Sequence, residues 1–346
     1  MNKILSIFNS QQFKRIAGPL AALMLILLFN LIFTKGFFAI EIRDGRLFGS
    51  LIDILNRGAP VMLLSIGMTL VYATGGIDLS VGAVMAIAGA LAAYIIRPDY
   101  AHGIIEYRWV APVIVVIVLP LILSFICGMW NGMLVSYIGI QPIIATLILM
   151  VAGRGIAQTI TRGQIIIFDH DPFEFIGSGF ILGIPFPVIL VIIMLIITYF
   201  MTRKTALGMF IEAIGSNPVA SHYVGIRSKI IKFFVYAFCG VCAGLAGLIA
   251  TADIKGADAN NAGLFFELDA IASVIIGGTI WGGRFTLAGS MIGTLIIQSL
   301  TTTILTRGVP PEHTLVYKAI VVILVTLIQS EAFRRKLFQI VRVKRV

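Results

Sequence analysis

Two aspartates in apolar surroundings are the first side chains to consider for chemistry. Asp78 follows two glycines in the sequence TGGIDLS, and Asp269 lies in ELDA, each beside a long apolar run. An acid inside a membrane is a candidate for a proton relay, whereas an acid at the start of a helix can cap free backbone N–H groups. No other acid or histidine lies near Asp78 in the sequence. A capping role is therefore the favoured interpretation of both aspartates.

A cysteine pair and a glycine-rich turn are further candidates. Cys239 and Cys242 form a CxxC, but no second pair and no nearby histidine would complete a metal site. Small residues that let helices pack closely explain the pair better. The glycine-rich sequence at 275–284 lacks the Gly-Lys-Ser/Thr of a phosphate loop. The sequence therefore predicts no catalytic residue, no metal and no cofactor.

Polar residues within the apolar runs suggest a path through the protein. Such side chains can line a route for a hydroxylated solute, or they can form hydrogen bonds between helices, and for any single residue the second interpretation is favoured. Arg154 and Lys318 stand near the ends of apolar runs, where snorkelling to the interface is expected. The candidates for a translocation path are Ser65, Thr69, Asp78, Asn131, Gln141, Thr146, Gln158 and Gln298, with Thr294 and Thr301 as further polar positions.

The elements that must position these residues are membrane-spanning helices. The chain has 346 residues, of which 59% are hydrophobic and 12% are charged, and its mean hydropathy is +1.02. A soluble domain has about a quarter of its residues charged, so this composition indicates a polytopic membrane protein. The net charge of +10 lies in short connections and in the tail, which argues against a nucleic-acid partner.

About ten apolar runs approach the roughly 20 residues that cross a bilayer. We predict an all-α protein with a single permease domain, a helical bundle at 16–329 and a basic tail at 330–346. Residues 131–139 are expected to be a connection, and the run at 267–280 is short enough to be re-entrant or a half-helix. The predicted runs are 16–34, 58–74, 77–96, 109–130, 132–139 leading into 140–160, 180–201, 230–251, 267–280, 285–306 and 314–329.

The distribution of lysine and arginine sets the expected orientation. Basic residues concentrate in the connections that lie inside when both termini are cytoplasmic, which is the positive-inside pattern. Residues 35–57 carry four basic residues on the outer side and depart from this pattern. We therefore expect residues 47–57 to lie in the membrane interface.

The polar stretch at 202–232, with its loop at 202–229, differs from the other connections. Residues 206–214 can form a short helix, the sequence Gly-Ser-Asn-Pro at 215–218 is a stop signal, and 218–225 can form a second short helix. Flanked by basic residues, these helices would suit a docking surface on the cytoplasmic side. An ordinary positive-inside loop is the alternative that composition leaves open.

Several motifs resemble one family of transporters over most of the chain, from about residue 45 to 330. The sequences ATGGIDLSVGAVMAIAGA at 73–90, GMFIEAIG at 208–215 and ELDAIASVIIGGTIWGG at 267–283 resemble the permease subunits of the ribose/galactose/arabinose class of ATP-binding-cassette importers. Within that class, DGRLFGSLIDILNR, QPIIATLILMVAGRGIAQ, TRKTALGMFIEAIG and ADIKGADANNAGL resemble the galactofuranose permeases in particular.

The resemblance implies a type II-like importer permease in a bacterial inner membrane. It implies a monosaccharide substrate, with galactofuranose favoured, a second permease subunit that is identical or related, and a periplasmic sugar-binding protein. ATP would be hydrolysed by a separate ATP-binding subunit, so the chain itself would not be an enzyme. The docking residues for that subunit would be Gly208, Phe210, Ile211, Glu212, Ala213, Gly215, Asn217, Pro218 and Gly225.

Other classes of function remain as alternatives. A related permease for ribose, arabinose or galactose would share the same motifs. An ion-coupled secondary sugar transporter would need coupling carboxylates at mid-membrane, and only Asp78 and Asp269 are available, both near turns. An intramembrane enzyme would need converging reactive groups, but all four histidines stand in connections.

Overall fold

The computed structural model of the protein describes residues 11–43, 45–96, 99–101, 104–106 and 112–329. Each apolar run predicted from the sequence corresponds to a helix, so the all-α architecture is confirmed. Among the described residues, seven helices are long and apolar enough to cross a membrane. The helices of the apolar runs are α2 (Gln11–Phe33), α3 (Ser50–Ala73), α4 (Val81–Ile96), α5 (Val113–Met133), α6 (Pro142–Thr161), α8 (Phe186–Arg203), α11 (Ser228–Asp253), α12 (Phe266–Ile276), α13 (Leu287–Thr306) and α14 (Pro311–Gln329).

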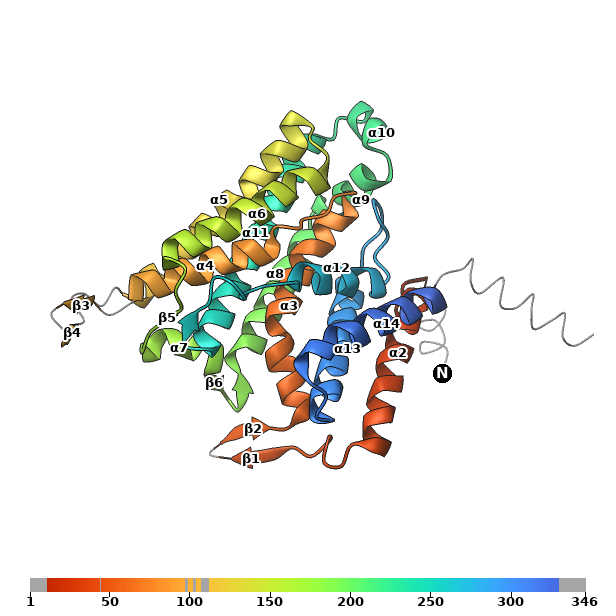
Figure 1. Ribbon diagram of the computed structural model, residues 1–346. Coiled ribbons are helices and arrows are strands. Elements are labelled where there is room, and N and C mark those ends of the chain that lie inside the picture. Colours follow the sequence, from red (N-terminus) through yellow and green to blue (C-terminus); the bar gives the residue numbers. More distant parts are fainter. Residues whose placement is uncertain (1–10, 44, 97–98, 102–103, 107–111, 330–346) are drawn as a thin grey trace, which may run out of the picture.

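Helix α3 lies at the centre of the bundle, and α2 lies at its edge (Figure 1). In the most apolar stretch of 18 residues in each helix, 83% of the residues of α3 are buried, compared with 11% of the residues of α2. Small residues allow this packing, because a Cβ atom on Gly67 of α3 would lie 2.8 Å from the Cα of Cys239 in α11. Cys239 and Cys242 are buried in this contact as free thiols. The CxxC therefore packs two helices together, as the small-residue interpretation predicts.

Short elements cluster at the two ends of the bundle (Figure 1). At one end, here called the loop end, lie α9 (Leu207–Ser216) and α10 (Pro218–Tyr223). At the other, here called the hairpin end, lie α7 (Asp171–Ser178) and small antiparallel strand pairs. These pairs are β1 (Glu41–Arg43) with β2 (Arg46–Phe48), β3 (Asp99–Ala101) with β4 (Ile104–Glu106), β5 (Ile166–Ile167) with β8 (Gly256–Ala257), and β6 (Phe180–Ile181) with β7 (Ile184–Pro185).

Two predicted boundaries are wrong. Residues 131–139 are not a connection, because α5 continues past Asn131 into the π-helix η1 (Leu134–Ile138), which ends at Gly139 with φ of 85°. Polar side chains of this stretch form hydrogen bonds inside the helix, since the Ser136 hydroxyl donates to the Gly132 carbonyl. The second error concerns α3, which begins at Ser50 instead of near residue 58, directly after the β1–β2 hairpin.

Helix α12 has the length expected of a half-helix. Its 11 residues span about 16 Å at about 1.5 Å per residue, roughly half of the hydrocarbon thickness of a bilayer. It ends at Gly277, and the chain returns through a glycine-rich hairpin at 277–286 into α13. The predicted basic tail at 330–346 and the N-terminal residues 1–10 lie outside the described residues, so the expected cytoplasmic termini remain a prediction.

Candidate functional site

Local sequence explains why α9 and α10 form at the loop end. The Thr205 hydroxyl accepts a hydrogen bond from the Leu207 N–H at 3.2 Å, at the start of α9. Helix α9 ends after Ser216, and the Asn217 side chain then caps α10 by accepting the Ala220 N–H at 2.9 Å. Asn217 therefore separates two helices, as its position in the stop sequence predicts. The stop takes effect later than expected, because Gly215 and Ser216 still belong to α9.

Helix α9 has a buried face and an exposed face. The side chains of Ile211 and Ile214 are fully buried, and Gly208 is buried beside them. Met209 on the opposite face is 65% exposed. Gly208 and Ile211, both expected to be docking residues, therefore fix the helix to the bundle and do not offer a surface to a partner.

The exposed apolar surface extends from α9 to α10. Large side chains that the sequence prediction did not include are exposed there: Met209, Val219, Tyr223 and Val224. Asn217, Pro218 and Gly225 are exposed on the same two-helix element, and Phe210, Glu212, Ala213 and Gly215 are partly buried. Apolar side chains in a polar loop were the signal that could have identified the additional four residues.

Gly215 joins α9 to two other elements. A Cβ atom on Gly215 would collide with the Ala73 carbonyl at the end of α3 and would lie 2.7 Å from the Gly282 carbonyl carbon. The Gly282 N–H donates to the Tyr72 carbonyl at 3.1 Å, and the Tyr72 and Trp281 rings pack edge to face at 4.9 Å. The end of α9, the end of α3 and the 277–286 hairpin thus meet through backbone atoms with no space between them.

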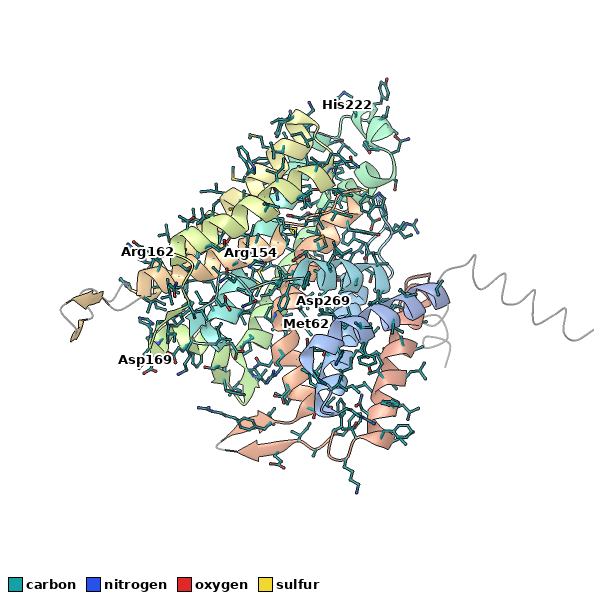
Figure 2. The ribbon with its side chains drawn as sticks, in the orientation of Figure 1. Met62, Arg154, Arg162, Asp169, His222 and Asp269 are labelled. Atoms are coloured by element: carbon teal, nitrogen blue, oxygen red, sulfur yellow. The ribbon has the colours of Figure 1, made fainter. Side chains whose placement is uncertain are left out.

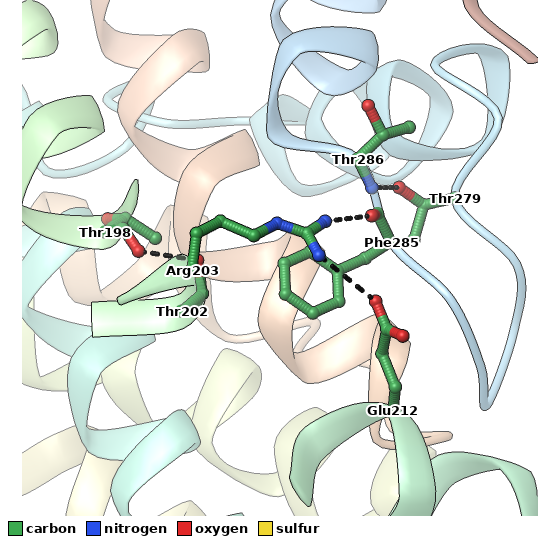
Figure 3. A network of polar contacts seen from close by, with 7 residues as sticks. All are labelled: Thr198, Thr202, Arg203, Glu212, Thr279, Phe285 and Thr286. Carbon is green, nitrogen blue, oxygen red and sulfur yellow. Dashed lines mark hydrogen bonds and ion pairs between the residues drawn. The ribbon is translucent and has the colours of Figure 1, made fainter. Parts of the chain in front are cut away.

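Arg203 at the end of α8 adds polar contacts to the same assembly (Figure 3). Its guanidinium donates to the Phe285 carbonyl at 3.0 Å, lies over the Phe285 ring at 4.9 Å, and is 3.7 Å from the Glu212 carboxylate on α9. Because both partners of the ion pair are partly exposed, it contributes little to stability. Its effect is to fix the position of α9 relative to α8 and the 277–286 hairpin.

Asp78 lies in the break between α3 and α4, five residues after Ala73, the residue of α3 that contacts α9. The Asp78 side chain is buried, with 1% of the residue exposed. Its Oδ1 accepts the Ser80 N–H at 2.9 Å, the Ser80 hydroxyl at 2.6 Å and the Asn131 amide at 3.3 Å. The Asn131 amide also donates to the Ser80 hydroxyl at 2.8 Å. The carboxylate holds the turn before α4, which agrees with the expected capping role. It also ties this turn to α5, which sequence spacing could not reveal.

Three of the other polar positions proposed for a path, Ser65, Thr69 and Thr294, form hydrogen bonds between helices. Thr69 donates to Ser290 at 2.7 Å, and Thr294 donates to Ser65 at 3.0 Å, so α3 is joined to α13. The other proposed residues do not lie together. Thr146 donates to the Pro142 carbonyl of its own helix, and Gln141 is exposed just before α6. Gln158 donates to Asn260, and Gln298 lines a cavity at the hairpin end.

Three expectations for charged residues are wrong. Arg154 donates to the Ala259 and Ala262 carbonyls at 3.0 and 2.6 Å instead of snorkelling. Lys318 donates to the Asp269 carboxylate at 2.8 Å. Asp269 is thus part of an ion pair between α12 and α14 and not a helix cap. Each partner is distant in the sequence, so the local pattern could not indicate it.

The family model described as branched-chain amino acid transport system / permease component matches residues 50–326. The galactofuranose transporter permease YtfT of Escherichia coli is 52% identical over 91% of this chain and 89% of its own length. No solved structure matches the chain.

Two further relatives name other sugars. The fructose import permease FruF of Bifidobacterium longum is 41% identical over 90% of this chain and 86% of its own length. The ribose import permease RbsC of Escherichia coli is 35% identical over 82% of this chain and 86% of its own length. The predicted resemblance to sugar permeases is therefore confirmed, and this multi-pass membrane protein belongs to the family of transport-system permease components.

Proposed function

We propose that this chain is the permease subunit of an ATP-driven importer that carries a monosaccharide across the bacterial inner membrane. The observation that carries the proposal is the 52% identity with a galactofuranose transporter permease over nearly the whole chain. Galactofuranose is therefore the favoured substrate. The permeases named for fructose and ribose are less similar, at 41% and 35% identity, and they supply the alternative sugars.

The loop end supports a coupling role. An ATP-binding subunit would dock on the exposed face of α9 and α10 and would hydrolyse the ATP, so that end would face the cytoplasm. Since Gly215 contacts Ala73 and Gly282 without a gap, a movement of α9 would be passed on to α3 and to the 277–286 hairpin. Rigid elements packed in this way transmit displacement as units.

The remaining partners of the importer follow from the same proposal. A periplasmic binding protein would deliver the sugar to the hairpin end. A second permease subunit, identical or related, would complete the path through the bilayer. The Arg203 contacts to Glu212 and Phe285 would keep α8, α9 and the hairpin together during the movement.

The proposal is tested by co-purifying the chain with the products of its neighbouring genes and measuring ATPase activity in lipid nanodiscs. Sugar-loaded binding protein should raise the ATPase rate above that with the empty binding protein. Galactofuranose, galactopyranose, fructose and ribose would be compared at equal concentration, so that the substrate is identified in the same assay. If no ATPase co-purifies, or if its rate is the same with and without loaded binding protein, the proposed function is wrong.

A further inference from the structure

Asp78 is a buried carboxyl group that accepts hydrogen bonds on one of its two oxygens. The Oδ1 atom accepts bonds from the Ser80 N–H, the Ser80 hydroxyl and the Asn131 amide, at 2.9, 2.6 and 3.3 Å. Within the part of the chain that the structure describes, no nitrogen or oxygen donor bonds to Oδ2. In an ionised carboxylate both oxygens are acceptors, whereas in a carboxylic acid one oxygen accepts and the other carries a proton. The one-sided pattern at Asp78 fits the acid.

The cluster around Asp78 also lacks one donor. The Asn131 side chain is fully buried, and its Oδ1 has no hydrogen-bond partner. The Nδ2 of the same amide contacts Asp78 and donates to the Ser80 hydroxyl at 2.8 Å, so the unpaired oxygen belongs to this cluster. A buried acceptor without a donor is costly. A proton on the Asp78 carboxyl group adds a donor where the cluster is one short.

No cation balances a negative charge on Asp78. Among the described residues, no lysine, arginine or histidine forms an ion pair with it. Lys232 on α11 stands about two turns before the part of that helix that contacts Asp78. Arg154 on α6 lies within the bundle (Figure 2), where it is bound to two backbone carbonyls. On α12, the Glu267 carboxylate lies beside Gly82 at the start of α4, so the charge on that side is of the same sign.

The other titratable groups near Asp78 are neutral. Tyr236 and Cys239 lie near it on α11, and Cys127 lies near it on α5. Tyrosine and cysteine are uncharged at neutral pH unless a cation or another strong influence favours ionisation. The Cys239 thiol hydrogen-bonds with the carboxyl group, and the Tyr236 hydroxyl donates to the Ile77 carbonyl at 3.3 Å. None of these groups can compensate a negative charge on Asp78.

Burial decides between the ionised and the neutral form. Only 1% of Asp78 is exposed, so an ionised side chain would have lost its hydration shell. An isolated carboxylate in such a place is much more costly than the neutral acid, and the group takes up a proton instead. A carboxyl group kept neutral in this way can donate a hydrogen bond at neutral pH.

We propose that Asp78 is a proton-binding site, a carboxylic acid that stays neutral at physiological pH and joins the turn at 74–80 to α5 and α11. Its Oδ1 accepts the bonds from Ser80 and Asn131, and a proton on Oδ2 supplies the donor that the cluster lacks. The proton is taken from the solvent when the protein folds, and it is not released during transport. The inference stands on the contacts of Asp78 and does not depend on the proposed function.

Infrared spectroscopy of the whole permease in lipid nanodiscs tests for the proton directly, because a protonated carboxyl group has a C=O stretching band that a carboxylate lacks. At neutral pH, the wild-type spectrum minus that of Asp78→Asn should contain this band. Asp53→Asn, a change at an exposed aspartate of α3, is the matched control and should retain the band. In the wild type, ¹³C labelling of aspartate carboxyl carbons should shift the band, a measurement that does not require a variant to fold. A difference spectrum with carboxylate bands alone would overturn the proposal.

The dependence of stability on pH also distinguishes the two forms of Asp78. An unfolded aspartate loses its proton near pH 4, whereas the folded protein would keep it. The folded state then binds more protons than the unfolded state. The wild type should therefore lose stability relative to Asp78→Asn as the pH rises from about 5 to about 8, by up to about tenfold in the unfolding equilibrium constant per pH unit.

The measurement is the melting temperature of both proteins in detergent across this pH range. An Asp78 that is ionised in the folded state would be ionised in both states over the range, and the difference in melting temperature between the two proteins would stay constant. A constant difference would overturn the proposal.

The infrared band also decides whether the proton takes part in transport. In the complex with the ATP-binding subunit, the band should be the same without nucleotide and with ATP and sugar-loaded binding protein. A band that disappears in the second condition would show that the proton is released, and would overturn the static assignment. This measurement uses the complex of the proposed function and the first two use the permease alone, so failure of the importer and failure of the proton site are distinguishable.

Discussion

Asp78 brings a carboxylate into the bundle, and its partners indicate a structural task. The acceptor atom that binds Ser80 and Asn131 is also present in an asparagine side chain. We expect Asp78→Asn to retain substantial transport, because the amide oxygen can still accept the Ser80 N–H. Asp78→Leu should destabilise the protein by about 1–3 kcal/mol by leaving buried donors unpaired.

The measurement for these two variants is sugar uptake normalised to the amount of protein in the membrane. Thermal melting in detergent would report the stability difference between them. Complete loss of uptake in Asp78→Asn at normal expression would restore the proton-relay interpretation.

Glu174 at the hairpin end is a buried acid with a cationic partner. Burial alone would raise the pKa of Glu174, but the hydrogen bond from Lys255 and the His170 N–H, which is 2.9 Å from the carboxylate, lower the pKa below its ordinary value of 4.5. The folded state therefore gains stability from this group above pH 4.5, and loses it as the pH falls through the lowered pKa.

This linkage predicts a pH-dependent difference between two proteins. The melting temperature of the wild type in detergent should fall more steeply than that of Glu174→Gln as the pH is lowered from 6 to below the usual carboxyl range. The same contact raises the pKa of Lys255. The contribution of Lys255 to the stability of the fold would therefore be lost only as the pH rises through that raised pKa. Parallel acid profiles for wild type and Glu174→Gln would show that the pair does not stabilise the fold.

Helix α9 is the element through which a partner would act, and Gly215 is its closest contact. Gly215→Ala should cost about 1–3 kcal/mol, because the added methyl group collides with the Ala73 carbonyl and the backbones must separate. The expected result is ATPase activity that no longer follows sugar transport. Gly155→Ala is the matched control, since a Cβ atom there meets no atom within 4 Å. If ATP hydrolysis in Gly215→Ala still followed sugar transport as in the wild type, movement of α9 would not be passed on through the contact between Gly215 and Ala73.

The exposed face of α9 and α10 should decide whether an ATPase binds. Val224 is 76% exposed on this surface, and Val224→Asp should weaken co-purification of the ATP-binding subunit without loss of the folded permease. A buried charge in an apolar interface is costly to the complex, while in the free protein it faces water. Leu182→Asp, at the exposed tip of the β6–β7 hairpin at the opposite end, is the control that should not affect the ATPase. Equal ATPase recovery from both variants would place the docking surface elsewhere.

The whole molecule is a bundle whose two ends suit different tasks. The loop end brings α8, α9, the end of α3 and the 277–286 hairpin into contact through Gly215, Gly282 and Arg203. The hairpin end holds a cavity of about 520 Å³ among α3, α11, α12, α13 and α14. Helix α3 reaches both ends, since Asn56 lies in the cavity wall and Ala73 touches α9. Helix α3 therefore connects the two ends of the bundle directly.

Sequence periodicity and composition were sufficient for the elements of this architecture. Long apolar runs have few alternatives to membrane helices, because backbone polar groups must be satisfied internally there. Stop residues such as Asn217 act within their own turn, so the two short helices of the loop were also predictable. The failures occurred where a polar residue lies inside the bundle, as at Asn131, whose side-chain amide donates to Asp78 and Ser80 in the break between α3 and α4.

By itself, the sequence determined that the chain is a helical membrane permease with a polar loop of two short helices, because hydropathy, charge distribution and family motifs are local or linear properties. Only the tertiary structure decided which polar groups meet. It paired Lys318 with Asp269, bound Arg154 to the 259–262 carbonyls, turned Ile211 inward and placed Gln298 beside Asn56 in one cavity. These contacts join residues on different helices, and the packing of small residues such as Gly67 and Gly215 sets which helix faces come together.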